Sequence, residues 1–113
     1  MSAQRLRPQR SDFGTIRVGN AVIGRIAAIA AREVPGVAEV REGTWPWRGV
    51  RVEATEPEVT IRLEIVVEYG VHIPRVTVQV QERVRAAVHR MTELGTVVVD
   101  VGVCGVQESK EGS

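Results

Sequence analysis

Cysteine is nearly absent from this 113-residue chain, which contains only Cys104. A single cysteine excludes an internal disulfide framework and a multi-cysteine zinc site. Aromatic residues make up 4% of the chain. No apolar run approaches the roughly 18 residues that a membrane-spanning helix needs. The N-terminal segment is polar and lacks the apolar stretch of a secretory signal. We therefore expect a cytoplasmic protein.

A strong excess of either charge is also missing. The chain has 15 basic and 14 acidic residues, which give a formal net charge of +1. The whole chain therefore has no strong field for nucleic acid or an acidic membrane surface. The N-terminal segment is locally basic, because four arginines (Arg5, Arg7, Arg10 and Arg17) stand there against one aspartate.

Valine is the residue that the chain has in abundance, with 22 copies. Since β-branched side chains suit a pleated surface, this core favours sheet. The length is typical of a single domain. We expect one domain over residues 13–107, between a disordered basic arm at 1–12 and a disordered tail at 108–113. Both ends lack hydrophobic periodicity.

Two segments have helical periodicity. In residues 20–33 the apolar positions form one stripe, with Asn20 as the expected N-cap and Pro35 after the end. In residues 74–94 a local alternation of valines favours a strand, but the longer window favours a helix. Its stripe steps by three or four residues: Ile73, Val76, Val80, Val84, Ala87, Met91 and Leu94.

Strands are expected at residues 15–18, 37–41, 50–54, 59–69 and 96–106. The clearest alternates from Val59 to Tyr69, with Val66 on the wetter face and Tyr69 on the buried one. In the last strand, Val98 and Val106 are expected to point away from the core. The order β-α-β-β-β-α-β predicts an α+β two-layer sandwich, with two helices on one face of a three- to five-stranded mixed, mainly antiparallel sheet.

The residues of catalytic type form no constellation. His72 and His89 have no Cys, Asp or Glu at metal-ligand spacing. Cys104 is expected to be a buried or partly buried structural thiol, because its context does not favour a lowered pKa. The phosphate-binding motif GxxxxGK[ST] is absent. We therefore predict no catalytic, cofactor-binding or metal-binding residues, no cofactor, no small-molecule substrate and no enzymatic activity.

The most unusual segment is Trp45-Pro46-Trp47-Arg48, which holds two of the four aromatic residues in a region that glycine and proline exclude from regular structure. Trp and Arg are favoured anchors of protein interfaces, so Trp45, Trp47 and Arg48 are candidate protein-contact residues. The alternative is that the two tryptophans fold back over a sheet edge as a lid. The sequence favours neither.

Three stretches together resemble the bacterial alkaline-shock and general-stress protein family, also called the envelope stress response family. They are GTIRV at 14–18 with AAREVPGV at 30–37, VVEYGVHIPRV at 66–76, and VVVDVGVCGV at 97–106. The resemblance covers about residues 13–107. The chain departs from the family pattern at Glu93, where glycine is common, and at the Trp-Pro-Trp segment, which replaces a plainer glycine-rich connection.

The resemblance implies a non-enzymatic, self-associating cytoplasmic scaffold, linked to cell-envelope stress homeostasis and recruited to the inner face of the membrane by a membrane-anchored protein. The valine-rich last strand independently favours a homo-oligomer, because a pairable edge usually needs a partner. The alternative function is a small nucleic-acid-binding domain that uses the four N-terminal arginines.

Overall fold

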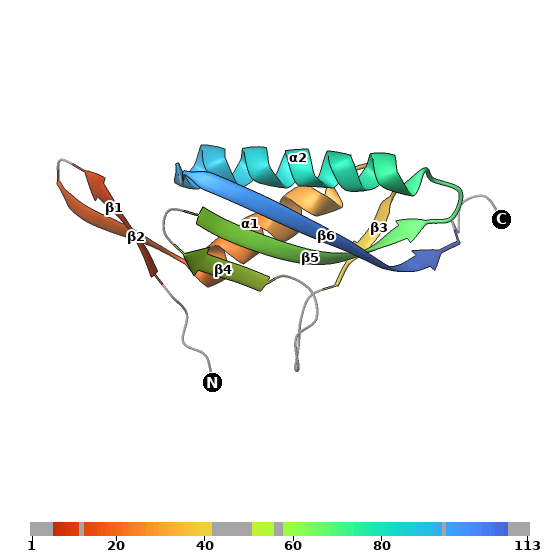
Figure 1. The fold of residues 1–113 in the computed structure, drawn as a ribbon, viewed down its shortest axis with the longest axis horizontal. Helices are drawn as coiled ribbons and strands as arrows, with labels where there is room; N and C mark the ends of the chain where they lie inside the picture. Colours follow the sequence, from red (N-terminus) through yellow and green to blue (C-terminus); the bar gives the residue numbers. More distant parts are fainter. Residues whose placement is uncertain (1–5, 12, 42–50, 56–57, 94, 109–113) are drawn as a thin grey trace, which may run out of the picture.

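The computed structural model describes residues 6–11, 13–41, 51–55, 58–93 and 95–108. The molecule is elongated, 55 × 29 × 19 Å along its principal axes. Figure 1 shows two helices on one side of a sheet and a hairpin that projects from one end. In chain order the elements are β1 (Leu6–Ser11), β2 (Gly14–Gly19), α1 (Asn20–Arg32), β3 (Val37–Val40), β4 (Arg51–Thr55), β5 (Glu58–Glu68), α2 (Ile73–Thr92) and β6 (Thr96–Gln107).

Strand β5 is the centre of the four-stranded sheet. On one side it pairs antiparallel with β3 near its C-terminal end and with β4 near its N-terminal end. On the other side it pairs in parallel with β6 along its whole length. The parallel pair needs a crossover, which α2 supplies between the two strands. The predicted α+β class, with two helices on one face of a mixed sheet, is confirmed.

Helix α1 packs closely because its buried face is built from small side chains. Ile23, Ala27, Ala28, Ala30 and Ala31 are buried. Alanine combines high helix propensity with a short side chain, so the helix axis can approach its neighbours. The predicted N-cap is off by one position: Gly19 caps the helix and makes no side-chain hydrogen bond.

The segment in which a strand pattern competed with a helical pattern forms helix α2, as the longer window predicted. The buried residues of α2 recur every four positions: Val76, Val80, Val84, Val88 and Thr92. The predicted stripe is wrong at Ile73 and Met91, which are exposed, and its last member, Leu94, lies outside the described residues. Thr92 is compatible with burial because its hydroxyl donates to the carbonyl of Val88 over 2.6 Å.

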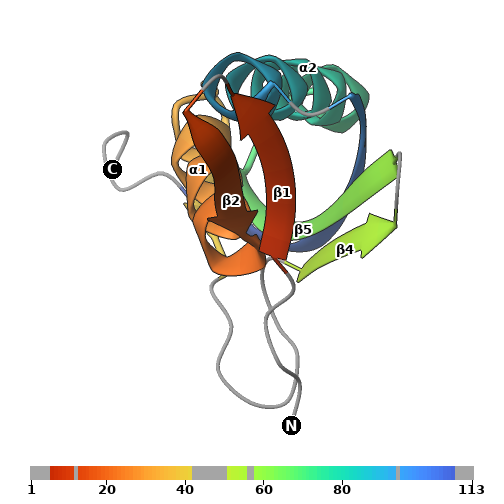
Figure 2. The same cartoon turned by 90° about the vertical axis from the view of Figure 1, so that its left-hand side faces the viewer.

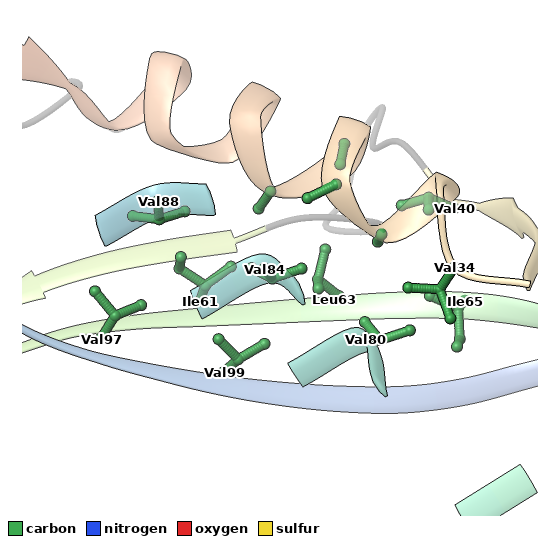
Figure 3. Close-up of a cluster of buried hydrophobic side chains, with 14 of the residues drawn as sticks. Val34, Val40, Ile61, Leu63, Ile65, Val80, Val84, Val88, Val97 and Val99 are labelled. Atoms are coloured by element: carbon green, nitrogen blue, oxygen red, sulfur yellow. The ribbon is translucent and has the colours of Figure 1, made fainter. Parts of the chain in front are cut away.

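The core lies between the helices and the inner face of β5. Ile61, Leu63 and Ile65 point toward the valines of α2, with Val97 and Val99 of β6 beside them (Figure 3). Removing any of these side chains would leave a cavity, at a cost of about 2–5 kcal/mol for Leu or Ile to Ala. This layer fixes the position of β6 relative to α2, which determines the surfaces described below.

Residues 6–11, expected as part of a disordered arm, form strand β1 and pair with β2 from Leu6–Gly19 to Ser11–Gly14. The tight register between Ser11 and Gly14 forms a two-residue connection, the shortest that joins antiparallel strands. The sequence pattern did not predict β1, because residues 6–11 do not alternate between apolar and polar side chains. The predicted boundaries of the folded domain stay a prediction.

Candidate interaction surfaces

The predicted contact residues Trp45, Trp47 and Arg48 lie in residues 42–50, outside the described residues, as does Arg5. The described residues on either side locate where this segment attaches. The N–H of Arg41 donates to the carbonyl of Glu64 over 2.9 Å, and Arg51 pairs with Arg62. Arg41 and Arg51, which flank segment 42–50, therefore lie on the same edge of β5, two β5 positions apart and opposite β6.

The face of the sheet turned away from the helices is mainly charged. Arg62 Nε lies 3.6 Å from Asp100 Oδ2, across the β5–β6 pair. The carboxylate of Glu64 lies over Gly102, where an added Cβ would meet both carboxylate oxygens at 2.9 Å. Because both partners of the ion pair are about half exposed or more, it contributes little to stability. This face is a polar surface with Val98 as its exposed apolar residue on β6.

A β-bulge in β6 changes several predicted orientations. Ile65 pairs with Val103 but Val66 pairs with Gly105, so Cys104 is the extra residue. Cys104 is exposed, and its predicted burial is wrong. The bulge also places Val106 opposite Val67, on the helix side of the sheet rather than on the outer face. Val66 keeps its predicted place on the outer face, beside Gly105, but is buried there.

An apolar group lies at the end of the molecule beyond the bulge. Tyr69 follows β5 and is 74% exposed, contrary to its predicted place in the core, and its N–H donates to the carbonyl of Gln107 over 2.9 Å. Val106 is 55% exposed and Ile73, at the start of α2, is 39% exposed. These side chains are available to another surface, although three residues make a small patch.

The outer edge of β6 is the longest open strand edge in the described part of the chain, because no described strand pairs with it. The carbonyl of Glu64 and the N–H of Glu68 both bond toward β3. The odd-numbered residues of β5 therefore direct their backbone groups toward β6. In a parallel ladder Ile61 then bonds to the residues flanking its partner Val99, and the N–H and carbonyl of Val99 point outward.

One side chain of α2 occupies this edge. Gln81 Nε2 donates to the outward carbonyl of Val99 over 3.1 Å. Arg83, two residues later, points the other way and bonds to Glu33 at the end of α1 over 3.1 Å. The two contacts fix the rotation of α2, with one side toward α1 and the other over the edge of β6.

A groove of about 310 Å³ runs between α2 and the beginning of β6. Its lining is Glu82, Arg85, Ala86, His89, Gly95 and Val97. The groove and the outer edge of β6 lie on the same side of α2, so the groove gives access to the open backbone groups. An edge strand beside a helix is the arrangement that accepts an added strand in several peptide-binding domains.

The β1–β2 hairpin extends away from the body of the molecule in Figure 1, and in Figure 2, viewed from that end, it lies in front of the body. Its main contact with the body is between β2 and α1, where half-buried Val18 packs against the core. Phe13, at the turn, is 100% exposed. Of the arginines proposed for nucleic-acid binding, Arg7, Arg10 and Arg17 belong to this hairpin.

Within the described ranges, no group of three or more His, Cys, Asp or Glu residues is arranged to hold a metal ion. His72 precedes α2 and His89 lies in the groove, and both are exposed. Among the same residues, no helix is both long enough and apolar enough to cross a membrane.

Comparison with known proteins adds a family and a fold. A family model described as alkaline-shock protein 23, with cell envelope-related function, matches residues 8–108. Protein YqhY of Bacillus subtilis is 34% identical over 109 residues, which are 86% of this chain and 80% of YqhY. A Streptococcus pyogenes protein named stress response regulator gls24 homolog is 27% identical over 110 residues, 87% of this chain and 62% of that protein.

Variants of MamM CTD are among the solved structures that match. Two of them superpose with TM-scores of 0.51 and 0.52, at 19% identity. Each match covers 75% of this chain and 93% or 90% of the other. At this identity the likeness shows a shared fold alone.

Proposed function

This chain belongs to the alkaline-shock protein 23 family, and from that membership we propose that it is a non-enzymatic, self-associating scaffold in cell-envelope stress homeostasis. The family's cell envelope-related function and the name of the streptococcal relative, a stress response regulator, support this role. The chain spans 62% of that relative, so any activity of its remaining part is separate from this proposal.

The observation that carries self-association is the outer edge of β6. The strand is twelve residues long, and Asp100 is its one charged residue. Proteins usually protect an edge strand with lysine, proline, short length or a covering element. Here the bulge at Cys104 and the hydrogen bond from Gln81 are the described protections, and no described strand pairs with the edge between Val97 and Val103.

Recruitment to the inner face of the membrane through a membrane-anchored protein is the second part of the proposal, and it rests on the family's link to the cell envelope. The Trp45–Arg48 segment is the proposed contact, because tryptophan and arginine supply large and specific interface contacts. The described residues that flank it, Arg41 and Arg51, lie on the β3–β4 side of β5, opposite the β6 edge proposed for self-association.

Two measurements test the proposal on the full chain. Sedimentation equilibrium at tens of micromolar is expected to show an oligomer, and a monomer would contradict self-association. A tagged chain is expected to capture one integral-membrane protein from detergent-solubilised membranes. Equal recovery with an unrelated tagged α+β protein of similar charge would contradict specific recruitment.

The nucleic-acid alternative is tested separately, because three of its four arginines belong to one hairpin. Phosphate contacts dominate such binding and weaken steeply with salt. A gel shift at physiological salt is expected to show no retardation of duplex or single-stranded DNA or of RNA. Retardation that is lost when Arg7, Arg10 and Arg17 are all changed to Gln would favour the alternative over the scaffold.

A further inference from the structure

Two parts of the structure each lack a partner strand. The β1–β2 hairpin is a separate two-stranded sheet, and an isolated hairpin is marginally stable at best in water. The outer edge of β6 is unpaired among the described residues and opens into the groove beside α2. A third strand would stabilise the hairpin, and an added strand would satisfy the outward backbone groups of β6.

We propose that strand β2 of one copy adds to the outer edge of β6 of a second copy, in the groove between β6 and α2. This inference rests on the self-association proposed above and specifies the surfaces that carry it. The resulting sheet continues from β5 and β6 of one copy into β2 and β1 of the other.

The hairpin itself determines which of its strands can pair further. Pro8 of β1 pairs with Arg17 of β2. Because proline has no N–H to donate, its nitrogen belongs at an unpaired edge, and the 8–17 pair is one whose backbone groups point away from each other. The outer edge of β1 therefore lacks a donor at Pro8. Arg17 keeps both its N–H and its carbonyl directed outward, so β2 is the strand with an open edge.

The receiving edge has a matching set of groups. The N–H and carbonyl of Val99 point outward, and these groups alternate in direction along a strand. Val97 and Val101, two residues away on either side, therefore also direct theirs outward. The amide of Gln81 already bonds to one of these carbonyls. An incoming N–H from β2 replaces that amide, and the flexible glutamine side chain turns into the groove. In the unpaired molecule, the Gln81 amide thus makes the hydrogen bond that an N–H of the added strand would make.

Charge supports a second copy of this chain as the occupant. Residues 1–19 contain four arginines and one aspartate, a net charge of +3, and the remaining residues contain eleven basic and thirteen acidic groups, a net charge of −2. The arm and the body of two copies therefore attract each other. The groove itself is balanced, because Glu82 and Arg85 both line it and Asp100 pairs with Arg62 on the outer face, so the attraction comes from the net charges of arm and body.

The arm and the groove lie at the same end of the long axis, since the hairpin projects next to the C-terminal end of α2 and the start of β6 (Figure 1). Two copies can therefore exchange arms reciprocally about a twofold axis. Such an interface is isologous and closes at a dimer, unlike a head-to-tail contact between opposite ends.

Cross-linking of mixed single-cysteine chains tests this arrangement. In a Cys104→Ser background, one full-length chain carries Thr15→Cys in β2 and a second carries Ala86→Cys in the groove. Treating the mixture with a short bis-maleimide is expected to give a cross-linked heterodimer, with little cross-linking of either variant alone. The matched control replaces Ala86→Cys by Tyr69→Cys, which is also an exposed site but at the opposite end, and is expected to give no heterodimer.

The outcomes separate this inference from the function on which it rests. If sedimentation shows an oligomer but the Thr15–Ala86 mixture gives no heterodimer, the arm exchange is wrong and self-association stands. If sedimentation shows only monomer, both fail. Amide hydrogen exchange of the unmodified chain gives a second measurement: Arg17, Val97 and Val101 are expected to exchange more slowly as concentration rises. Unchanged exchange at these three amides in the oligomer overturns the proposal.

Discussion

Gly36 approaches Val76 so closely that a Cβ on the glycine would lie 3.0 Å from Cγ2 of the valine. Gly36 follows α1 and has φ of +98°, a backbone conformation that residues with a side chain rarely adopt. Its carbonyl accepts a hydrogen bond from the N–H of Glu68 over 2.9 Å. The turn after α1 is thus held against the first turn of α2 and the end of β5 at once.

The change Gly36→Ala is expected to lower the free energy of unfolding by about 2–4 kcal/mol, because backbone strain of about 1–3 kcal/mol adds to overpacking against Val76. Gly70→Ala is the matched control, since Gly70 has the same φ of +98° but no neighbour within 4 Å. Chemical denaturation of both variants separates the two costs. An equal loss in both would show that contact with Val76 contributes nothing.

Glu93, where the resemblance leads us to expect glycine, ends α2 in a conformation that suits glycine. Its φ of 57° and ψ of 26° are left-handed, and its N–H donates to the carbonyl of His89 over 2.7 Å, which ends α2. Glycine adopts this conformation without the penalty that a Cβ brings. Glu93→Gly is therefore expected to raise the free energy of unfolding by about 1 kcal/mol.

Thermal unfolding checks this gain, with Glu82→Gly as the control. Glu82 is an exposed residue inside the same helix. There, glycine costs about 1 kcal/mol through backbone entropy. The two changes should therefore shift the melting temperature in opposite directions. A lowered melting temperature for Glu93→Gly would contradict the assignment of Glu93 as a strained helix end.

Periodicity was sufficient to predict the parts of the fold that one long pattern controls. The alternation from Val59 to Val67 predicted the core face of β5, and the stripe through Val80 and Val84 predicted α2 against a competing strand pattern. Both patterns are long, and each buries a single face, so the burial of apolar surface and local conformation favour the same structure.

What the sequence did not reveal depends on single backbone irregularities and on pairing between distant segments. The bulge at Cys104 reverses the side-chain alternation beyond it, and β-bulges have no fixed side-chain signature. Strand β1 has no apolar face of its own, so only its register with β2 identifies it. The bond from Gln81 to Val99 requires the rotation of α2 over β6, which a helical stripe does not specify to one residue.

Gln81→Leu is expected to lower the free energy of unfolding by about 0.5–1.5 kcal/mol, the usual net contribution of one hydrogen bond. It is also expected to strengthen self-association, because the carbonyl of Val99 is then open to an added strand. Gln79→Leu, at an exposed position of the same helix, controls for the added apolar surface. Sedimentation equilibrium compares the three chains, and equal association constants would contradict the role of Gln81 at this edge.

Trp45 and Trp47 have two interpretations, a partner contact and a lid over the sheet edge, and one double variant separates them. Burying a tryptophan side chain of about 200 Å² at roughly 25 cal/mol per Å² contributes at most about 5 kcal/mol. If Trp45 and Trp47 contact the membrane-anchored partner, the double change to alanine should reduce capture of that partner strongly. Stability should then stay within about 1 kcal/mol of the unchanged chain, as for a surface site.

If the two tryptophans instead cover the sheet edge between Arg41 and Arg51, the same double change should lower stability by several kcal/mol. Capture would then be lost only through unfolding. Melting temperature and pull-down efficiency measured on one preparation distinguish these outcomes, and the double change to phenylalanine serves as the conservative control. A destabilised alanine variant that still captures the partner at low temperature would exclude the contact role, because the folded fraction would bind without either tryptophan.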